Sequence, residues 1–243
     1  MFNFPVELMP FIGRNKERSE LRHLLTDPAS RLITLAGPGG TGKTRLAIEA
    51  AKDNASSFAD GIYFVGLQPV DAGGFLISSI ASTLRYSLRG VNELDELLDY
   101  VRDKELLLLL DNFEHLVDSA DLLNMLMRDS RIKLLVTSRE VLNLREEWVY
   151  PVQGLPFPAD PDDPDLETYG AVQLFLERAR RVQHDFSLDV ERVHVAQLCQ
   201  FLEGMPLALE LAASWLKSLP CSAIIKEIER SPDFLNTPLR NLP

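Results

Sequence analysis

The feature that most constrains this chain is a glycine-rich loop between a short apolar run and a sequence that favours helix. Residues 32–36 read as a buried strand. The pattern G-x-x-x-x-G-K-[ST] follows, with its defining positions at Gly37, Gly42, Lys43 and Thr44. Glycines let backbone N–H groups converge on phosphate oxygens, and the next helix N-terminus adds partial positive charge. The pattern therefore predicts a phosphate-binding loop.

Two side chains of this loop have distinct predicted roles. Lys43 is expected to reach the β- and γ-phosphates of a nucleotide, and the Thr44 hydroxyl is expected to bind Mg²⁺. The other nucleotide contacts predicted here are Pro38, Gly39, Gly40, Thr41, Gly42 and Arg45. A glycine-rich turn that binds nothing is the alternative, which the flanking strand and helix disfavour.

Composition limits the class of protein. The 243 residues are 46% hydrophobic, which is enough for one large core or a core plus a satellite domain. No apolar run is long enough to span a bilayer, and residues 1–10 lack a signal-peptide pattern, so we expect a cytoplasmic protein without membrane contact. The net charge of −11 repels phosphate backbones, so we expect no direct nucleic-acid binding. The only cysteines, Cys199 and Cys221, are expected to be core thiols.

Strands and helices alternate along the first part of the chain. Strands are predicted at 32–36, 61–67, 105–111, 132–140 and 147–152. Helices are predicted within 11–25, behind a turn at Gly13, and around 74–88, 91–103 and 117–128. The five consecutive leucines at 106–110 are typical of a central strand that is buried on both faces. We therefore expect an α/β fold, a phosphate-loop parallel sheet flanked by helices, with ligands at the carboxyl ends of the strands.

A change of composition divides the chain. Residues 156–168 are rich in proline and aspartate and read as a linker. Residues 1–155 before it are the predicted nucleotide-binding domain. Residues 169–230 after it are a predicted small all-α domain, with helices at 169–182, 190–202, 205–217 and 221–230, and residues 231–243 form an irregular tail.

The leucine strand ends in Asp111, where a carboxylate would hold Mg²⁺ directly or through water. Capping of the next helix is the alternative role. Hydrolysis needs a further group, and Asn112 can orient a water but cannot take its proton. Glu114 and His115 are nearby substitutes, or merely residues of the first helical turn.

Polar residues also end the next strand, at Thr137, Ser138 and Arg139. Arg139 would pair with the γ-phosphate, the group that separates ATP from ADP, unless it is an ordinary surface arginine. No [NT]-K-x-D guanine signature follows a strand, so we expect an adenine nucleotide.

Five motifs occur in an order that is informative: Phe11–Arg14, Gly37–Thr44, Leu106–Glu114, Leu135–Arg139 and Glu203–Leu209. Together they resemble the signal-transduction ATPases with numerous domains, the STAND class of P-loop NTPases with NB-ARC domains. Plant resistance proteins, the apoptotic protease-activating factor and large bacterial transcriptional regulators belong to that class. Leu-Asp-Asn-Phe-Glu-His and Gly-Met-Pro-Leu-Ala-Leu look most like the bacterial regulators.

The resemblance implies roles for particular residues. The step from Phe11 through Ile12 and Gly13 to Arg14, within segment 8–25, would line the adenine and ribose pocket. Lys43, Thr44 and Asp111 would hold phosphates and Mg²⁺, and Arg139 would sense the γ-phosphate. Pro206, with Leu207 beside it, would touch the base from the helical domain. Without the resemblance, Gly204 and Pro206 read as a helix stop and an N1 proline.

Two departures from the family pattern shape the expected function. Many relatives have a second acidic residue where this chain has Asn112, so we expect at most a weak ATPase. Relatives also continue into a winged-helix domain, so we expect this chain to be part of a longer protein with sensor and effector domains.

We therefore expect an ATP/ADP-binding switch with slow, Mg²⁺-dependent hydrolysis, closed with ADP and self-associating with ATP. An actively hydrolysing AAA+-like motor is the alternative, and a phosphotransferase would need an acceptor pocket that the sequence does not reveal.

Overall fold

The computed structural model describes residues 3–6, 9–67, 74–90, 92–128 and 130–231. Packing divides the chain into two compact units. The sheet unit comprises Met1–Phe11, Asn15–Gly39 and Lys43–Val152, and the helical unit comprises Ile12–Arg14, Gly40–Gly42 and Gln153–Pro243. The predictions for position 8, for the helix start at position 91 and for the tail 232–243 lie outside the described residues.

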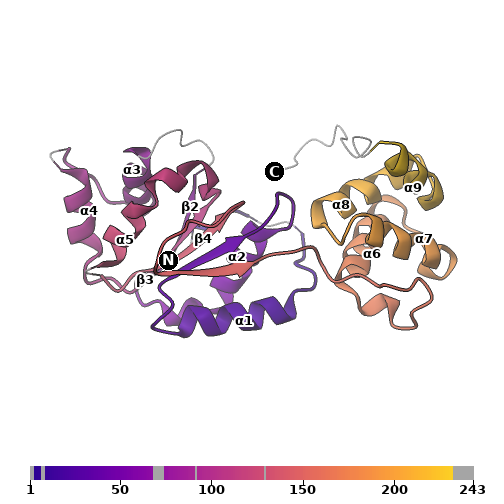
Figure 1. Ribbon diagram of the computed structural model, residues 1–243, viewed down its shortest axis with the longest axis horizontal. Helices are drawn as coiled ribbons and strands as arrows, with labels where there is room; N and C mark the ends of the chain where they lie inside the picture. The colour runs from indigo at the N-terminus through magenta and orange to yellow at the C-terminus, as the bar shows by residue number, and fades with distance from the viewer. Residues whose placement is uncertain (1–2, 7–8, 68–73, 91, 129, 232–243) are drawn as a thin grey trace. The chain divides into compact units, whose positions relative to one another are not determined.

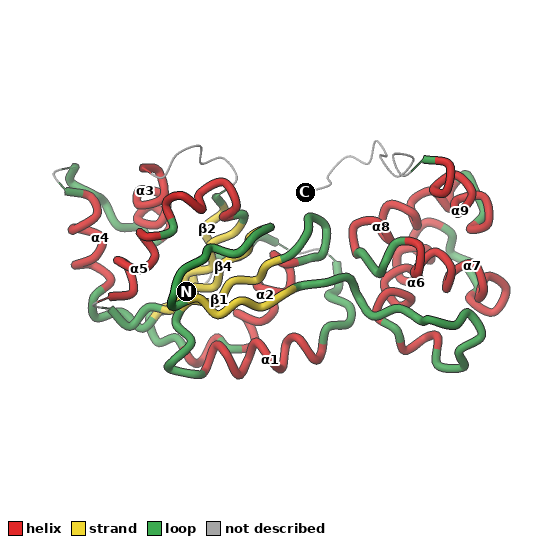
Figure 2. Tube along the Cα trace, in the orientation of Figure 1, coloured by secondary structure: helices red, strands yellow, loops and turns green. Residues whose placement is uncertain are grey.

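The sheet unit is built on five parallel strands in the order β2-β3-β4-β1-β5. The strands are drawn in yellow in Figure 2. Their bounds are β1 Leu32–Ala36, β2 Gly61–Gly66, β3 Leu106–Asp111, β4 Lys133–Ser138 and β5 Glu147–Pro151. In register, Leu108 of β3 pairs with Leu134 of β4, and Leu134 in turn pairs with Leu32 of β1. The predicted parallel sheet flanked by helices is confirmed.

The leucine strand β3 explains why the sheet is covered on both faces. Leu106, Leu108 and Leu110 pack into one hydrophobic core, whereas Leu107 and Leu109 pack into another. Successive strand side chains point to opposite faces, so an unbroken apolar run requires helices on both sides.

Helices supply those two covers (Figure 1). One core is shared with α1 (Asn15–Thr26) and α2 (Lys43–Asp53). The other is shared with α3 (Gly74–Thr83), α4 (Glu93–Val101) and α5 (Asp121–Arg128). No helix in the described part of the chain is long and apolar enough to cross a bilayer.

Two predicted helices are shorter than expected. The helix predicted at 74–88 ends at Thr83, because Arg85 adopts a left-handed backbone with φ of 57°. The helix predicted at 117–128 begins only at Asp121, because a 3₁₀ helix, Phe113–Ser119, occupies the preceding residues. Tight 3₁₀ turns are common where a chain leaves a strand and enters a helix.

Strand β5 lies at one edge of the sheet and ends in Pro151. The next residue, Val152, donates its N–H to the carbonyl of Ala36 at 2.7 Å. Backbone groups alternate in direction along a strand, so position 151 faces away from β1. Proline has no N–H to donate and is therefore tolerated at this outward edge position.

The helical unit contains α6 (Gly170–Val182), α7 (Leu188–Phe201), α8 (Pro206–Ser214) and α9 (Cys221–Arg230). The helix predicted at 205–217 is α8 followed by a 3₁₀ turn, Trp215–Lys217. One core joins all four helices, and in it Phe175 packs edge-on against Phe186 with ring centroids 6.0 Å apart. Cys199 and Cys221 are buried there, and burial raises the pKa of each thiol to about 12.

The turn between α7 and α8 depends on glycine. Gly204 has φ of 64°, and its N–H donates to the carbonyl of Cys199 at 3.0 Å, which closes the end of α7. A Cβ on Gly204 would lie 2.0 Å from the carbonyl oxygen of Leu155. Pro206 follows at the first position of α8. Gly204 therefore ends one helix and Pro206 begins the next, as their residue types predict.

Candidate nucleotide-binding site

The backbone of the predicted phosphate loop depends on three of its glycines. A Cβ on Gly37 would lie 2.3 Å from the carbonyl oxygen of Val152, so no other residue fits there without a backbone shift. Gly40 and Gly42 have φ of 79° and 83°, in the left-handed region. Gly39 has neither constraint, because a Cβ there would meet no atom closer than 3.9 Å.

Lys43 lies inside the loop. Its Nζ donates to the carbonyls of Gly37 at 2.7 Å and Pro38 at 2.9 Å, and the residue is only 9% exposed. Burial lowers the pKa of Lys43, while the nearby Glu114 carboxylate opposes that shift. A poorly hydrated cation surrounded by loop backbone is well suited to bind a phosphate oxygen.

Asp111 is held by two hydroxyls. Its Oδ1 accepts hydrogen bonds from Thr44 Oγ1 and from Thr137 Oγ1, each at 2.6 Å. These donors come from α2 and β4, so the carboxylate is fixed beside the loop rather than capping the turn that follows it. Burial raises the pKa of Asp111 despite both hydrogen bonds.

The donor set of Thr44 and Asp111 fits Mg²⁺. A hydroxyl and a carboxylate are the hard oxygen ligands that this ion prefers, and a divalent cation would compensate the buried negative charge. The described residues contain no cluster of three or more His, Cys, Asp or Glu side chains arranged to hold a metal. Mg²⁺ is usually bound by one or two protein groups together with substrate phosphates and water.

Asn112 follows Asp111 in a left-handed conformation, with φ of 61° and ψ of 54°. Asparagine tolerates this region better than most residues, so the left-handed turn after β3 explains why an asparagine suits position 112. Its N–H donates to Thr137 Oγ1 at 3.0 Å, and its side-chain amide lies 3.4 Å from Asp111 Oδ2. Thr137 thus links the Asn112 backbone to the Asp111 carboxylate.

Arg139 and Glu114 form an ion pair, with Arg139 Nε 3.1 Å from Glu114 Oε1. The guanidinium also lies beside the loop, because a Cβ on Gly39 would be 3.9 Å from Arg139 Cζ. His115, the other predicted substitute for a catalytic acid, directs Nε2 to the carbonyl of Leu67 at 2.9 Å. Glu114 is thus ion-paired with Arg139, which borders the phosphate loop, whereas the hydrogen bond of His115 is to Leu67.

Arg14 has a role that sequence reasoning missed. The residue is 6% exposed with φ of 61°, and its Nη2 donates to the carbonyls of Thr41 at 2.8 Å and Gln153 at 2.7 Å. It therefore braces the tip of the phosphate loop within the helical unit. Gly13 before it is also left-handed, and Ile12 packs against the helical core. No sequence pattern signals these carbonyl contacts.

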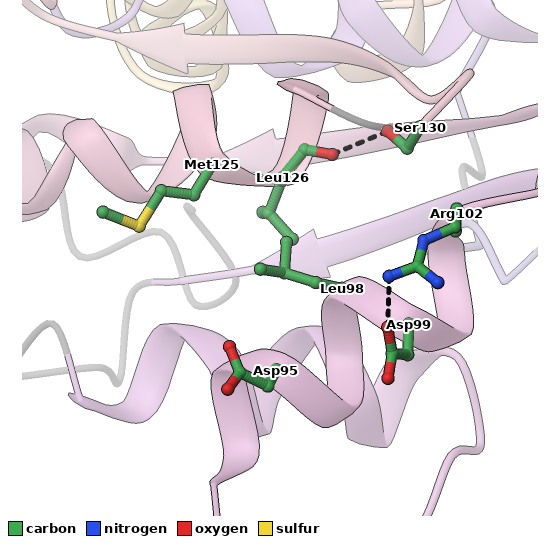
Figure 3. Close-up of a pocket in the computed structure, with 7 residues that line it drawn as sticks. All are labelled: Asp95, Leu98, Asp99, Arg102, Met125, Leu126 and Ser130. Carbon is green, nitrogen blue, oxygen red and sulfur yellow. Dashed lines mark hydrogen bonds and ion pairs between the residues drawn. The ribbon is translucent and has the colours of Figure 1, made fainter.

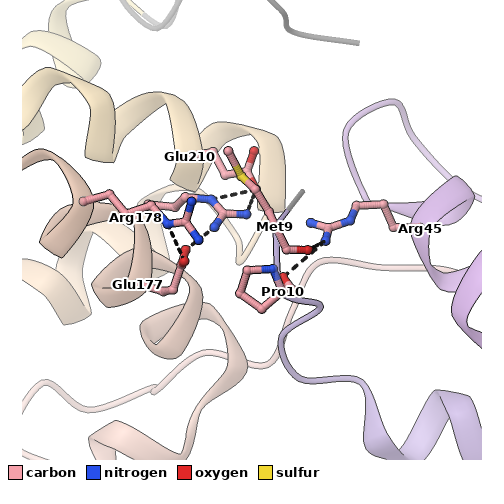
Figure 4. Close-up of polar contacts among 7 residues, drawn as sticks. Met9, Pro10, Arg45, Glu177, Arg178 and Glu210 are labelled. Carbon is pink, nitrogen blue, oxygen red and sulfur yellow. Dashed lines mark hydrogen bonds and ion pairs between the residues drawn. The ribbon is translucent and has the colours of Figure 1, made fainter. Parts of the chain in front are cut away.

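Phe11 and Arg45 lie within the sheet unit. The Arg45 guanidinium lies 5.8 Å from the centroid of the Phe11 ring, a cation–π distance. Arg45 Nη2 also donates to the carbonyls of Met9 and Pro10, at 2.7 and 3.2 Å (Figure 4). Arg45 thus holds the chain segment that leads into Phe11.

The start of α8 contacts the loop tip, and both belong to the helical unit. Leu207 donates its N–H to the carbonyl of Gly40 at 3.2 Å, and a Cβ on Gly42 would lie 3.9 Å from Pro206 Cγ. Helix α8 is in turn tied to α6, since Arg178 Nη2 donates to Glu210 Oε1 at 2.8 Å (Figure 4). Arg178 is 6% exposed, so this pair lies in a protected environment.

A separate hollow of about 320 Å³ lies on α4 and α5 (Figure 3). Its lining is Asp95, Leu98, Asp99, Arg102, Met125, Leu126 and Ser130. In it, the Arg102 guanidinium pairs with the Asp99 carboxylate. None of these residues belongs to the five motifs, so the hollow is distinct from the candidate nucleotide site.

We expect Asp111→Asn to remove the contribution of Mg²⁺ to ATP binding. The amide keeps an oxygen for both threonine hydroxyls but loses the charge that attracts the ion. In the unchanged chain, ATP affinity should be about tenfold higher with Mg²⁺ than with a chelator; this corresponds to about 1.4 kcal/mol. In Asp111→Asn, titration should give the same affinity in both buffers. Asp118→Asn, at an exposed position nearby, is the matched control; an undiminished Mg²⁺ effect in Asp111→Asn would contradict the metal role.

Comparison with known proteins identifies relatives of this chain. The family model described as the NB-ARC domain matches residues 15–145. An uncharacterized protein of Mycobacterium tuberculosis is 36% identical over 211 residues, which cover 85% of this chain and 51% of that protein. A second protein of that organism, named as a candidate HTH-type transcriptional regulator, is 34% identical over 194 residues, which cover 78% of this chain and 21% of that protein. The chain spans about half the length of the first relative and less of the second.

Solved structures share the fold. A Walker-type ATPase of Pyrococcus abyssi matches with a TM-score of 0.59 at 16% identity, over 95% of this chain and 76% of that one. The ORC2 protein of Aeropyrum pernix, in ADPNP and ADP complexes, matches with a TM-score of 0.55 at 17% identity, over 89% and 67%. The family match covers over half of the sequence, and the suspected resemblance is confirmed: the chain belongs to the NB-ARC domain family, P-loop NTPases of the STAND class.

Proposed function

We propose that this chain is the ATP/ADP-binding switch module of a transcriptional regulator, with slow Mg²⁺-dependent hydrolysis of ATP. The family implies nucleotide binding, and some relatives are named as HTH-type regulators. The observation that carries the switch assignment is Arg139, whose guanidinium lies beside loop residue Gly39 and pairs with Glu114. A cation at that place would contact a γ-phosphate, the group that ADP lacks, and thus bind the two nucleotides differently.

Each group at the loop has a proposed task. Lys43 and the loop N–H groups bind the phosphates, and Thr44 and Asp111 hold Mg²⁺. When bound, that ion would neutralise charge on the phosphate oxygens. Asn112 stands where many relatives carry an acid, so no proton acceptor directly follows Asp111 and slow turnover is expected.

The proposed adenine side of the site uses Phe11–Arg14 together with Pro206 and Leu207. Two contacts support this assignment: Arg14 braces Thr41, and Leu207 is bonded to Gly40. A change in the backbone at the loop tip would therefore act directly on the start of α8.

The proposal also includes the domain boundaries 1–155, 156–168 and 169–230. It further includes self-association in the ATP state, and winged-helix and effector domains in the whole protein.

Hydrolysis kinetics distinguish a switch from a motor. The chain is purified, and the nucleotide released on denaturation is identified by chromatography. Single-turnover and steady-state hydrolysis of ATP with Mg²⁺ are then measured. Retained ADP with little turnover would support the switch, whereas sustained turnover above about 1 s⁻¹, the low end of ordinary enzyme rates, would favour the motor. Absence of any nucleotide binding would overturn both.

We expect Arg139→Ala to narrow the discrimination between ATP and ADP. Loss of a charged hydrogen bond costs about 1.5–3 kcal/mol, which corresponds to a loss of about 10- to 150-fold in ATP affinity. ADP affinity should change little, because ADP offers no γ-phosphate to Arg139. Titration of the variant and of the unchanged chain with each nucleotide measures the ratio of ATP affinity to ADP affinity. Arg131→Ala, which breaks an exposed ion pair with Glu105, is the control; equal losses for ATP and ADP would argue against a sensor.

A further inference from the structure

Glu114 has an unusual carboxylate. One oxygen, Oε1, is paired with Arg139, whereas Oε2 is buried and has no hydrogen-bond partner among the described residues. Buried polar atoms are nearly always hydrogen-bonded, and an exception calls for an explanation that includes a catalytic role. A carboxylate oxygen with unused acceptor capacity is able to accept a hydrogen bond from water.

The charge of Glu114 acts on the groups that define the site. Burial lowers the pKa of Lys43 in the loop, and the Glu114 charge opposes that shift; burial raises the pKa of Asp111 at the end of β3, and the Glu114 charge adds to that rise. Such effects require proximity, so the carboxylate lies within electrostatic range of both the phosphate-binding cation and the metal-site acid. Asn112, which is closer to Asp111 in sequence, contributes only an amide.

Arg139 connects this carboxylate to the loop. The same guanidinium lies 3.1 Å from Glu114 Oε1 and beside Gly39. Its side chain is 69% exposed, so it is not locked by packing and has room to change partner. A γ-phosphate at the loop would compete with Glu114 for the same donors, because both are oxyanions that match the guanidinium.

We propose that Glu114 is the proton acceptor for the water that attacks ATP, and that Arg139 controls it by exchanging Glu114 for the γ-phosphate. The inference rests on the proposed function, because it requires ATP at the loop. It places the missing acid of this site three residues after Asp111, in the 3₁₀ helix, rather than at position 112.

The step balances without an added reactant. The water oxygen forms a bond to the γ-phosphorus while the bond from that phosphorus to the β–γ bridging oxygen breaks. ADP leaves with the electron pair of that bond, and the water proton passes to Glu114 Oε2 and then to solvent or phosphate. Before Arg139 moves to the γ-phosphate, its pairing with Oε1 fixes the orientation of the carboxylate, so exchange must precede efficient hydrolysis.

The test is Glu114→Gln, an isosteric variant that orients water but accepts no proton. Single-turnover hydrolysis of pre-bound ATP should fall by at least about 100-fold, the usual contribution of a general base. ATP affinity, measured by titration, should rise about two- to fivefold, because Arg139 no longer has to break a partly exposed ion pair with Glu114, while ADP affinity stays the same. Glu140→Gln, an exposed acid next to Arg139, should change none of these values.

Several outcomes would overturn the proposal. An unchanged single-turnover rate in Glu114→Gln removes the proton-acceptor role, and an unchanged ATP affinity removes the exchange of Arg139. Either result leaves the switch function standing as long as the unchanged chain binds ATP and ADP; failure of that binding overturns the function itself. If thermal unfolding shows that Glu114→Gln is misfolded, Glu114→Asp decides the question. Glu114→Asp keeps the negative charge but moves the carboxylate back by one methylene, so we expect the single-turnover rate to fall about tenfold. An unchanged rate in Glu114→Asp would contradict the proposal.

Discussion

Lys43→Ala is expected to lower the affinity for ATP by about 30-fold to several thousand-fold. Removing one partner of a buried, hydrogen-bonded charge pair costs about 2–5 kcal/mol, and here the partner is a phosphate surrounded by loop backbone. The fold should survive the change, because burial lowers the pKa of Lys43 and so disfavours its charged form in the native state. Calorimetric titration with ATP and Mg²⁺ measures the loss.

Lys52→Ala serves as the control for Lys43→Ala. Lys52 lies on the same helix, where it makes an exposed ion pair with Glu49, so its removal should leave the affinity unchanged. Thermal unfolding of both variants should stay within a few degrees of the unchanged chain. If Lys43→Ala bound ATP as tightly as the control, the assignment of the loop as a phosphate site would fail.

Gly37→Ala is expected to destabilise the sheet unit by about 3 kcal/mol, because its Cβ would lie 2.3 Å from a backbone oxygen of Val152. Backbone hydrogen bonds hold both partners in place. The Val152 N–H donates to the carbonyl of Ala36, and the Gly37 N–H donates to the carbonyl of Ser138. The midpoint of thermal unfolding should fall by roughly 6–12 °C. Nucleotide affinity should fall as well, since the loop backbone must move.

Gly39→Ala is a matched control two residues away. A Cβ there would touch only the Arg139 guanidinium at 3.9 Å, an ordinary contact with an exposed side chain. Its unfolding midpoint should therefore stay close to that of the unchanged chain. Equal destabilisation by the two substitutions would mean that the close approach of Gly37 to Val152 does not limit the loop.

Much of the fold was predictable because its signals are local. The leucine run at 106–110 favoured a strand buried on both faces, and Gly204 with Pro206 marked the junction of two helices. Two details were beyond sequence reasoning. The left-handed turn at Arg85 contains no glycine or asparagine that would predict it. The 3₁₀ helix Phe113–Ser119 takes up the first three residues of the α-helix predicted at 117–128, and no residue there marks the change of helix type.

For the candidate site, motifs identified the residues but not their partners. Lys43, Thr44 and Asp111 could be chosen from spacing, because a phosphate loop and a strand-ending acid are recognisable patterns. The pairing of Arg139 with Glu114 could not, since it joins two elements whose separation depends on the sheet order. The contact of Arg14 with Thr41 was unpredictable for a different reason, because its acceptor is a main-chain carbonyl, which has no residue signature.

The two buried thiols allow opening of the helical unit to be measured separately from the sheet unit. Cys199 and Cys221 are the only cysteines in the sequence, and both lie in that unit with a pKa of about 12. Thiolate is the reactive form, so alkylation at neutral pH requires the core to open. The rate of alkylation therefore reports opening of the helical unit alone, and comparing it with ATP, with ADP and without nucleotide would show which ligand stabilises α7 and α9.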